Sequence, residues 1–522
     1  MRYGEAFKKY QSIEGWNTGT IGIEMLGWCE RYKERTGIIA GDTELSYGEL
    51  GARILLAAKG FYNAGIKHGD RVILQLPNSI NFVVSFFGLL RIGAIPIMAL
   101  PAHRSSEILG MVKTAEPTAY ICQEFYSGYD YKNQVEEAVA AGNIQVVVTV
   151  GEGESILKKL NMDYAGELPE PDNLDIAFLS LSGGTTGMSK LIPRTHGDYL
   201  YDSKVSVDRC KLTCEDRMLI VLPIAHNFVL GHPGFIGCFS VGATLVINEY
   251  PDMNEALEKV EEYGVTFMSL VPSMAKLMLE ILEEDDFDIS SLRVVQIGGS
   301  FLEEEVAERL MDLNQFTLQQ VFGVAEGLNT MTDLSDPREI VRLYQGKKTS
   351  AYDKIRIVDE EGRELPPGES GELLVSGPYT IRSYYNHPEN ASFFTEDGFY
   401  KTGDRAYVTE DGNLKIVGRI KEMINKGGEK ILPSELETCL YDMEGIRDSA
   451  VVGLHDANLG ERICVFIVGD ESIGLSEVRS FLTDKNIAAF KLPDEVMHID
   501  ALPLTKIGKV DKKKLVQIGE NK

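Results

Sequence analysis

The apolar and polar positions in the first two-thirds of the chain follow two alternating periodicities. Continuous apolar runs with the length of a buried strand occur at 71–76, 94–98, 119–122, 144–150, 218–222, 244–248 and 265–270. Segments with helical spacing lie between many of these runs, at 21–32, 47–64, 79–92, 253–263 and 273–282. Repeats of strand, helix and strand predict parallel sheets covered by helices, and several crossovers in one chain predict a doubly wound α/β core.

The pattern changes after about residue 350. Short apolar segments at 354–358, 371–376, 406–408 and 414–416 are separated by acidic turns that contain glycine, which predicts antiparallel hairpins in a small β-barrel-like part. A last unit of about one hundred residues then follows, with the size of a small α+β domain. Because no proline-rich linker intervenes, we expect a short hinge between a large N-terminal domain, 1–418, and a small C-terminal domain, 419–522.

Composition narrows the possible partners and the compartment. The 522 residues carry a formal net charge of -27, which argues against nucleic acid or an anionic membrane as a partner. The first eleven residues are charged and lack the apolar segment of a secretory signal. The most apolar window, 81–100, is interrupted by Arg91, Gly93 and Pro96, which favours a buried helix and strand over a membrane span. Seven scattered cysteines are typical of structural thiols, so we expect a cytoplasmic protein.

A stretch rich in glycine and hydroxyl side chains, Ser182–Lys190, follows the apolar run 176–181. Its backbone N–H groups, hydroxyl groups and lysine ammonium are donors suited to phosphate oxygens. The spacing is not that of a Walker A loop, because Met188 and Ser189 separate Gly187 from the lysine. The alternative is an ordinary surface turn, although such a turn does not require the terminal lysine.

Two further apolar segments end in residues suited to a flat ligand. The segment 294–300 ends in Gly298, Gly299 and Ser300, and paired glycines allow a ligand to approach the backbone closely. The segment 319–327 reaches an aromatic residue, a glycine and then a carboxylate, at Phe322, Gly323 and Glu326. This order suits base stacking beside a Mg²⁺ ligand, while the simpler interpretation is a core phenylalanine and a solvated glutamate.

Two charged motifs lie near and beyond the expected hinge. Asp404 follows a glycine and Arg419 comes fifteen residues later, an arrangement that suits recognition of a ribose diol. Lys509 follows a glycine within 502–510, where an exposed turn would allow it to neutralise charge on a phosphate. The simpler interpretations are an aspartate-capped turn with a surface arginine, and a basic solvated tail.

Together and in this order, the five motifs resemble those of the ANL adenylating superfamily, which contains acyl-CoA synthetases, adenylation domains of nonribosomal peptide synthetases and luciferase-like enzymes. The resemblance extends from the Leu-Ser-Tyr-Gly-Glu-Leu motif at 45–50 to Gly508-Lys509. Within the superfamily, the segments 100–104, 190–196 and 226–228 look like those of the stand-alone aryl-acid AMP ligases. The type member of that subgroup activates 2,3-dihydroxybenzoate for siderophore biosynthesis.

The resemblance implies an ATP-dependent ligase with two half-reactions. A hydroxyaryl carboxylic acid would form an acyl-adenylate with release of pyrophosphate, and the acyl group would then pass to the phosphopantetheine thiol of a carrier protein in siderophore or nonribosomal peptide biosynthesis. The expected acid is 2,3-dihydroxybenzoate, salicylate or a more polar analogue such as hydroxypicolinate. No carrier domain follows the lysine motif, so we expect the acceptor to come in trans. The alternatives are an aryl-CoA ligase and a non-catalytic nucleotide-binding protein.

The resemblance also implies a role for individual residues. ATP would be bound by Ser182, Gly183, Gly184, Thr185, Thr186, Gly187, Lys190, Gly298, Gly299, Ser300, Phe322, Gly323, Asp404 and Arg419. Glu326 would hold Mg²⁺, and Thr186 and Lys190 would act at the phosphates. Lys509 would act in adenylate formation, and a mobile C-terminal domain would rotate about Lys421 between the half-reactions.

The acid would be bound by His226, Asn227, Phe228, His232 and Asn329. Asn227 stands where amino-acid-activating relatives have an aspartate, and a neutral amide does not balance a substrate ammonium. His232 and Asn329 depart from the aryl-acid pattern, which has a small Ser or Cys and a small aliphatic residue there. Either the acid carries an additional polar group, or His232 turns away from it and is an ordinary packed histidine.

Overall fold

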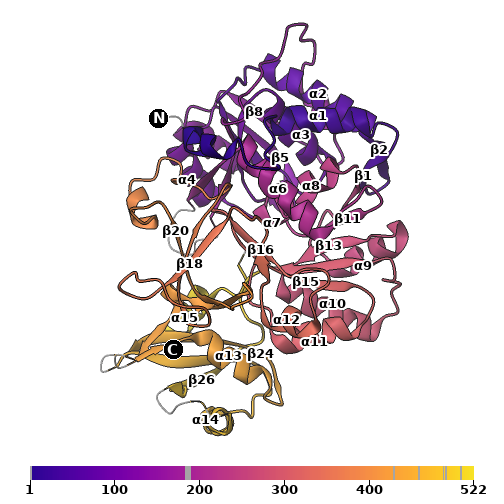
Figure 1. Ribbon diagram of the computed structural model, residues 1–522. Helices are drawn as coiled ribbons and strands as arrows, with labels where there is room; N and C mark the ends of the chain where they lie inside the picture. Colours follow the sequence, from indigo (N-terminus) through magenta and orange to yellow (C-terminus); the bar gives the residue numbers. More distant parts are fainter. Residues whose placement is uncertain are drawn as a thin grey trace. The chain divides into compact units, whose positions relative to one another are not determined.

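The computed structural model describes residues 3–182, 190–426, 429–456, 459–485, 487, 491–505 and 508–521 (Figure 1). Two compact units divide the chain. The first comprises Met1–Arg342, Gly346–Lys354 and Val375–Tyr400, and the second comprises Leu343–Gln345, Ile355–Leu374 and Lys401–Lys522. The fold class agrees with the prediction, because several sheets are combined with helices in a mixed α/β architecture with a separate C-terminal part.

A nine-stranded sheet forms the larger layer of the first unit. Its order is β17 (Lys347–Lys348), β16 (Leu328–Met331), β15 (Thr317–Val324), β14 (Val294–Gly298), β13 (Phe267–Leu270), β11 (Arg217–Ile220), β12 (Thr244–Ile247), β1 (Thr36–Ala40) and β2 (Thr43–Ser46). The pairs from β15 to β1 are parallel, and the pairs at both edges are antiparallel. Sequence-distant strands lie side by side in this sheet, which is the expected consequence of repeated crossovers.

A six-stranded sheet forms the second layer of strands in this unit. Its order is β10 (Leu191–Thr195), β9 (Ile176–Leu181), β4 (Ile95–Met98), β3 (Arg71–Gln75), β5 (Ala119–Gln123) and β8 (Val146–Val150), with only the β9–β10 pair antiparallel. A two-stranded ribbon is formed by β6 (Phe125–Tyr126) and β7 (Tyr129–Asp130). Residues 183–189 of the glycine-rich stretch lie outside the described residues and separate β9 from β10 in the sequence, so both strands adjoin the expected phosphate-binding stretch.

Helices connect the strands of the first unit. They are α1 (Ile21–Arg31), α2 (Tyr47–Asn63), α3 (Ile80–Arg91), α4 (Ser105–Ala115), α5 (Lys132–Ala141), α6 (His196–Cys210), α7 (Asn227–Gly231), α8 (Gly234–Ser240), α9 (Met253–Tyr263), α10 (Pro272–Glu284), α11 (Glu304–Asp312) and α12 (Arg338–Leu343), with single 3-10 turns η1 (Tyr3–Tyr10), η2 (Ile156–Lys159) and η3 (Asn390–Phe393). Helix α3 is buried from Phe82 to Leu90, and its phenylalanines pack edge-on against those of α8. The most apolar window of the sequence is therefore a core helix followed by β4. Among the described residues, no helix has both the length and the apolar character needed to cross a membrane.

The second unit contains two sheets. One has the order β18 (Lys354–Val358), β19 (Gly371–Ser376), β20 (Tyr400–Val408) and β21 (Leu414–Arg419), with the antiparallel β20–β21 hairpin that the turn pattern predicted. The other has the order β23 (Glu429–Ile431), β22 (Ile424–Lys426), β25 (Gly460–Gly469) and β24 (Ile446–Asp456), with β26 (Glu495–His498) parallel to β25. The 3-10 turn η4 (Ile420–Glu422) and the helices α13 (Pro433–Tyr441), α14 (Leu475–Asp484) and α15 (Lys512–Glu520) complete the unit.

Alternation along β24 and β25 divides the core of this C-terminal sheet between its two faces. Val451, Val465 and Ile467 belong to the apolar cluster that includes residues of α13 and α14. Val452 and Phe466 belong to the cluster that includes Leu515 of α15. Successive side chains of a strand point to opposite faces, so helices on both faces can bury the sheet. The boundary between residues 418 and 419 remains a prediction.

Candidate active site

The polar part of the site in the first unit begins where β10 meets α6. Thr195 caps α6, because its hydroxyl accepts a hydrogen bond from the Asp198 N–H at 3.1 Å and its own N–H donates to the Asp198 carboxylate at 2.7 Å. This cap fixes Asp198 in the first turn of α6, and Asp202 lies one turn further along the same face. Both carboxylates thereby face Arg194, the fully buried side chain that precedes the cap.

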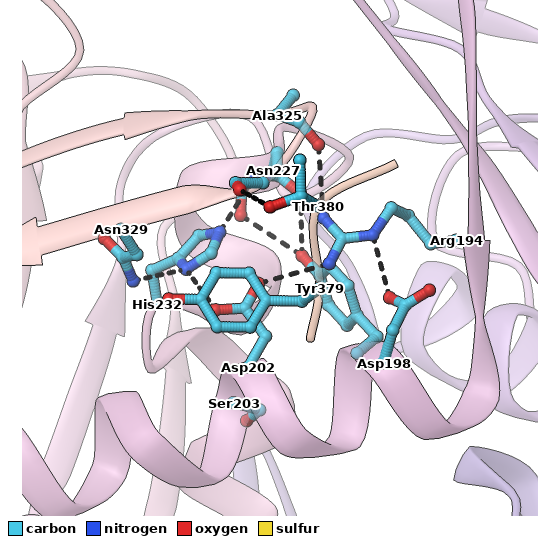
Figure 2. Close-up of polar contacts among 12 residues, drawn as sticks. Arg194, Asp198, Asp202, Ser203, Asn227, His232, Ala325, Asn329, Tyr379 and Thr380 are labelled. Atoms are coloured by element: carbon cyan, nitrogen blue, oxygen red, sulfur yellow. Dashed lines mark hydrogen bonds and ion pairs between the residues drawn. The ribbon is translucent and has the colours of Figure 1, made fainter. Parts of the chain in front are cut away.

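Arg194 forms a buried ion cluster with these two carboxylates (Figure 2). Its Nε lies 2.9 Å from Asp198 Oδ1, its Nη2 lies 3.3 Å from Asp202 Oδ2, and its Nη1 donates to the Ala325 carbonyl at 3.1 Å. Burial lowers the pKa of the guanidinium, but the two carboxylates raise it by more, so Arg194 remains charged. The cluster links α6 to the residue that directly precedes Glu326.

The residues expected to bind the acid lie around α7. Tyr199 of α6 donates a hydrogen bond from its hydroxyl to Asn227 Oδ1 at 2.9 Å. The Asn227 Nδ2 lies 2.9 Å from His232 Nε2, and the other ring nitrogen of His232 lies 2.8 Å from Asn329 Nδ2 (Figure 2). The structure thus brings three of the expected residues, Asn227, His232 and Asn329, into one buried or half-buried network.

His226 and Phe228 flank Asn227 and have different environments. His226 Nδ1 accepts a hydrogen bond from the Phe228 N–H at 3.3 Å and caps α7. The Phe228 ring packs close to Gly298, where a Cβ would lie 3.2 Å from the ring and 2.7 Å from the Val321 carbonyl. A side chain at position 298 would displace backbone, so this glycine is required by the close packing of β14 and β15.

The residues expected to bind adenine lie toward the carboxyl ends of two interior strands of the nine-stranded sheet. Strands β14 and β15 are parallel and Gly298 pairs with Val321, so Phe322 and Gly299 lie at the carboxyl ends of neighbouring strands. Ser300 follows and is exposed, and Gly323 of β15 is exposed as well. Ligands of open α/β sheets bind at the carboxyl ends of the strands.

Glu326 and Lys190 meet at a tyrosine that the sequence motifs did not indicate. The Tyr384 hydroxyl donates to Glu326 Oε1 at 2.6 Å, and Glu326 is buried. The Lys190 ammonium lies 4.6 Å from the centre of the Tyr384 ring and 4.2 Å from that of Phe393. Tyr384 therefore brings the Lys190 ammonium and the Glu326 carboxylate near one another.

The segment 379–381 holds the backbone of the Glu326 loop by hydrogen bonds. The Thr380 hydroxyl donates to the Gly327 carbonyl at 2.7 Å, and the Ile381 N–H donates to the Glu326 carbonyl at 2.8 Å. Gly327 has a φ of 107°, and a Cβ there would lie 2.0 Å from the Tyr379 carbonyl. The tight turn before β16 and the contact with residue 379 both require glycine at this position.

Asp353 anchors this supporting segment through Tyr379, whose hydroxyl donates to the Asp353 carboxylate. Burial raises the pKa of Asp353 from 3.8 to about 8. The folded protein therefore binds a proton that the unfolded chain releases between about pH 4 and pH 8, so this group's contribution to the free energy of unfolding falls as the pH rises through that window. We expect Asp353→Asn to remove this dependence, which amounts to at most about 1.4 kcal/mol per pH unit.

Urea unfolding of both proteins at about pH 5 and about pH 8 measures this effect. The free energy of unfolding of the variant relative to the parent protein should rise with pH. Parallel pH dependences of the two proteins would contradict a raised Asp353 pKa.

The remaining expected site residues belong to the second unit. Asp404 of β20 pairs with Arg419 of β21 across the antiparallel ladder, and Arg419 Nε lies 2.6 Å from Asp404 Oδ1. The Lys509 carbonyl accepts a hydrogen bond from the Thr505 N–H, and the Lys509 N–H donates to the Thr505 hydroxyl. Lys421 belongs to η4.

The predicted phosphate-binding stretch is described only at its two ends. Gly183, Gly184, Thr185, Thr186 and Gly187 lie outside the described residues, whereas Ser182 and Lys190 at the two ends of the stretch are described and joined by two hydrogen bonds of 3.0 Å. Sequence analysis missed Tyr199, Tyr384 and the Arg194 cluster. Only the cluster had a sequence signal, a capping box at 195–198 followed by a second aspartate one helical turn later.

Comparisons with known proteins show which family the chain matches. The family model described as AMP-binding enzyme matches residues 27–385, and the model of the AMP-binding enzyme C-terminal domain matches residues 435–509. The chain is 42% identical over 515 residues to the 2,3-dihydroxybenzoate-AMP ligase of Bacillus subtilis, with 98% of this chain and 96% of the relative covered. It is 40% identical over 520 residues to the salicyl-AMP ligase / salicyl-S-ArCP synthetase of Mycobacterium tuberculosis, with 97% and 92% covered. The apo structure of Mycobacterium smegmatis MbtA superimposes with a TM-score of 0.74 at 36% identity, with 99% of this chain and 97% of that chain covered.

Proposed function

Because the chain belongs to the AMP-binding enzyme family, we propose that it activates a hydroxyaryl carboxylic acid with ATP and transfers the acyl group to a phosphopantetheine thiol. The observation that carries this proposal is similarity over nearly the whole chain to relatives named for 2,3-dihydroxybenzoate and salicylate. Both substrates have a hydroxyl group ortho to the carboxylate. The products of the first step would be the acyl-adenylate and pyrophosphate.

The charges around Asn227 support an aryl acid rather than an α-amino acid. The substrate ammonium of an amino acid needs a carboxylate, and the two nearby carboxylates, Asp198 and Asp202, already face Arg194. Asn227 itself is a neutral amide that can exchange hydrogen bonds with an ortho oxygen or ring nitrogen. Phe228, which follows Asn227 in sequence, adds an apolar ring as a neighbour for an aromatic substrate. His226 precedes Asn227.

The first step joins two anions, so catalysis consists mainly of positioning and charge neutralisation. In our proposal the glycine-rich stretch and Lys190 bind the phosphates, and the ends of β14 and β15 bind adenine. Within the described residues, no group of three or more His, Cys, Asp or Glu side chains could hold a metal ion. A single carboxylate suits Mg²⁺ that arrives with ATP, because Mg²⁺ in such sites binds one or two carboxylates and the substrate phosphates. Glu326 fits this role, and Mg²⁺ bound there would neutralise phosphate charge.

The second unit would contribute the ribose contacts and the mobile lysine. We assign the ribose diol to Asp404, with Arg419 beside it, and charge neutralisation during adenylate formation to Lys509. Rotation about Lys421 would then withdraw Lys509 before the thiol reacts. The thiol would attack the acyl carbonyl of the adenylate, forming the thioester and releasing AMP.

ATP–pyrophosphate exchange with a panel of acids tests the first half-reaction. We expect exchange with 2,3-dihydroxybenzoate and salicylate, weak exchange with benzoate and none with α-amino acids. Incubation of the active protein with ATP, the preferred acid and either a phosphopantetheinylated aryl carrier protein or CoA tests the second half-reaction. Thioester on the carrier is the expected result, thioester on CoA alone would identify an aryl-CoA ligase, and no exchange with any aryl acid would overturn the proposal.

A further inference from the structure

Both ring nitrogens of His232 lie against other protein side chains (Figure 2). Nε2 lies 2.9 Å from Asn227 Nδ2, while Nδ1 lies 2.8 Å from Asn329 Nδ2 and 3.4 Å from Asp202 Oδ1. The residue is 6% exposed. Both nitrogens of His232 therefore have protein partners. The histidine that stands here in place of a small residue does not require an additional polar group on the acid.

Hydrogen-bond balance determines which nitrogen of His232 carries the proton. Burial raises the pKa of Tyr199 far above its usual range, so its hydroxyl keeps its proton and donates it to Asn227 Oδ1. That bond leaves the Asn227 Nδ2 facing the ring, and an amide nitrogen only donates. His232 Nε2 must therefore accept, which places the single proton of a neutral imidazole on Nδ1.

The proton on Nδ1 has an acceptor on the opposite side of the ring. Asp202 Oδ1 is buried, faces Nδ1, and accepts no hydrogen bond from another described residue, while the other oxygen of this carboxylate contacts Arg194. The Asn329 Oδ1 is likewise buried without a donor among the described residues. Asn329 Nδ2 also lies 3.0 Å from the Ser206 hydroxyl, which can donate as well as accept. A turn of the Asn329 amide presents Oδ1 to both the ring and this hydroxyl in place of Nδ2. The buried arginine thus connects through Asp202 and His232 to Asn227.

This network determines what Asn227 offers to a ligand. Its Oδ1 already accepts from Tyr199, and one hydrogen of Nδ2 is directed to His232, so one N–H and one lone pair have no partner among the described residues. Asn227 is half-buried, so a bound ligand would cover this N–H, and a covered N–H without an acceptor is less well tolerated than a carbonyl oxygen that accepts a single bond. The remaining N–H is the group that a ligand has to satisfy.

We propose that His232 is a positioning residue that holds the Asn227 amide in one orientation and makes the site selective for aryl acids whose ortho atom accepts a hydrogen bond. This inference rests on the proposed function. An ortho hydroxyl directs its own hydrogen to the neighbouring carboxylate and presents its oxygen to the amide N–H. An ortho amino group instead presents a second N–H, because its lone pair is conjugated with the ring, so donor faces donor.

The ratio of kcat/KM for salicylate over 2-aminobenzoate in ATP–pyrophosphate exchange tests this selectivity. His232→Leu frees the Asn227 amide to rotate, and we expect the ratio to fall about 10- to 100-fold, as for one mismatched buried hydrogen bond. His232→Gln retains an acceptor oxygen and should keep the ratio within a few fold. Tyr199→Phe removes the donor that orients the amide, so it should lower the ratio as His232→Leu does.

Tyr201→Phe is the matched control for Tyr199→Phe. Tyr201 lies on the same helix and is also buried, but its hydroxyl bonds to Ser350 at 2.8 Å instead of to Asn227. Its removal should leave the ratio unchanged. Equal ratios in the parent protein, His232→Leu and Tyr199→Phe would contradict the positioning role, as would an equal loss in Tyr201→Phe, which would indicate a general packing effect.

Nitrogen NMR of the unmodified protein with ¹⁵N-labelled histidine provides a readout that needs no substrate. The His232 signals, assigned by their loss in His232→Gln, should show a protonated Nδ1 and an unprotonated Nε2. A proton on Nε2 would overturn the inference. Failure of every aryl acid in the exchange assay would overturn the proposed function instead, and the protonation state would still decide whether His232 accepts from Asn227.

Discussion

Replacement of Lys509 by alanine is expected to lower the rate of acyl-adenylate formation about 10²- to 10³-fold, as for the loss of one preorganised donor at a developing charge. In the proposed mechanism, its ammonium lies between the acid carboxylate and the α-phosphate in the transition state. Transfer of the acyl group from a preformed adenylate to a thiol does not require this charge, so that rate should change only a few fold. Pyrophosphate exchange measures the first rate, and single-turnover thioester formation from synthetic acyl-adenylate measures the second.

The backbone contacts of Lys509 determine what its replacement by alanine removes. Gly508 has a φ of 78°, and hydrogen bonds between Thr505 and residues 508 and 509 fix the backbone independently of the lysine side chain. Removal of the side chain should therefore leave the fold intact. Lys513→Ala removes the same charge from an exposed position of α15 and should have little effect on either rate. Normal exchange by Lys509→Ala would exclude the role that we assign to it.

Hydrophobic periodicity predicted the core strands and helices well, because the pattern of buried side chains along a segment depends on its secondary structure. The apolar runs became β3, β4 and β5, since both faces of the parallel sheet are covered and nearly every side chain of these strands is buried. The window around α3 is apolar enough to suggest a membrane span. Its interruptions at Arg91 and Pro96 favoured a buried helix followed by a strand instead, and the structure confirms this prediction. Periodicity does not predict the order of the strands in a sheet, such as the position of β1 between β12 and β2.

The candidate site was predictable only where its chemistry is contiguous in sequence. Glycine-rich and lysine-containing motifs can be recognised in the sequence, because several functional groups occur within a few residues. Tyr384 lies 58 positions from Glu326 and no motif connects the two, so only the fold reveals their hydrogen bond. The environment of His232 is another example, since its partners come from α6, α7 and β16. The sequence marked His232 as unusual but left open whether it faces the acid.

Replacement of Arg194 by leucine is expected to lower the free energy of unfolding of the first unit by about 3–5 kcal/mol, because breaking a buried ion cluster leaves charges without compensation. Asp198 and Asp202 are 1% and 0% exposed, so water cannot replace the guanidinium without opening the core. Urea unfolding followed by tryptophan fluorescence measures the effect selectively, because both tryptophans, Trp16 and Trp28, belong to this unit. The lost hydrogen bond to Ala325 should also loosen the Glu326 loop and reduce pyrophosphate exchange.

Two further variants separate buried charge from general damage. Lys204→Met breaks an exposed ion pair with Asp208 on the same helix and should cost no more than about 0.5 kcal/mol, because solvent screens such pairs. Adding Asp198→Asn and Asp202→Asn to Arg194→Leu removes the uncompensated charges and should restore part of the lost stability. A loss below about 1 kcal/mol in the single variant, or no recovery in the triple variant, would show that these carboxylates do not depend on Arg194 for their burial. Because the same arginine contacts both Asp202, behind His232, and Ala325, before Glu326, stability and the two proposed halves of the site should change together in the single variant.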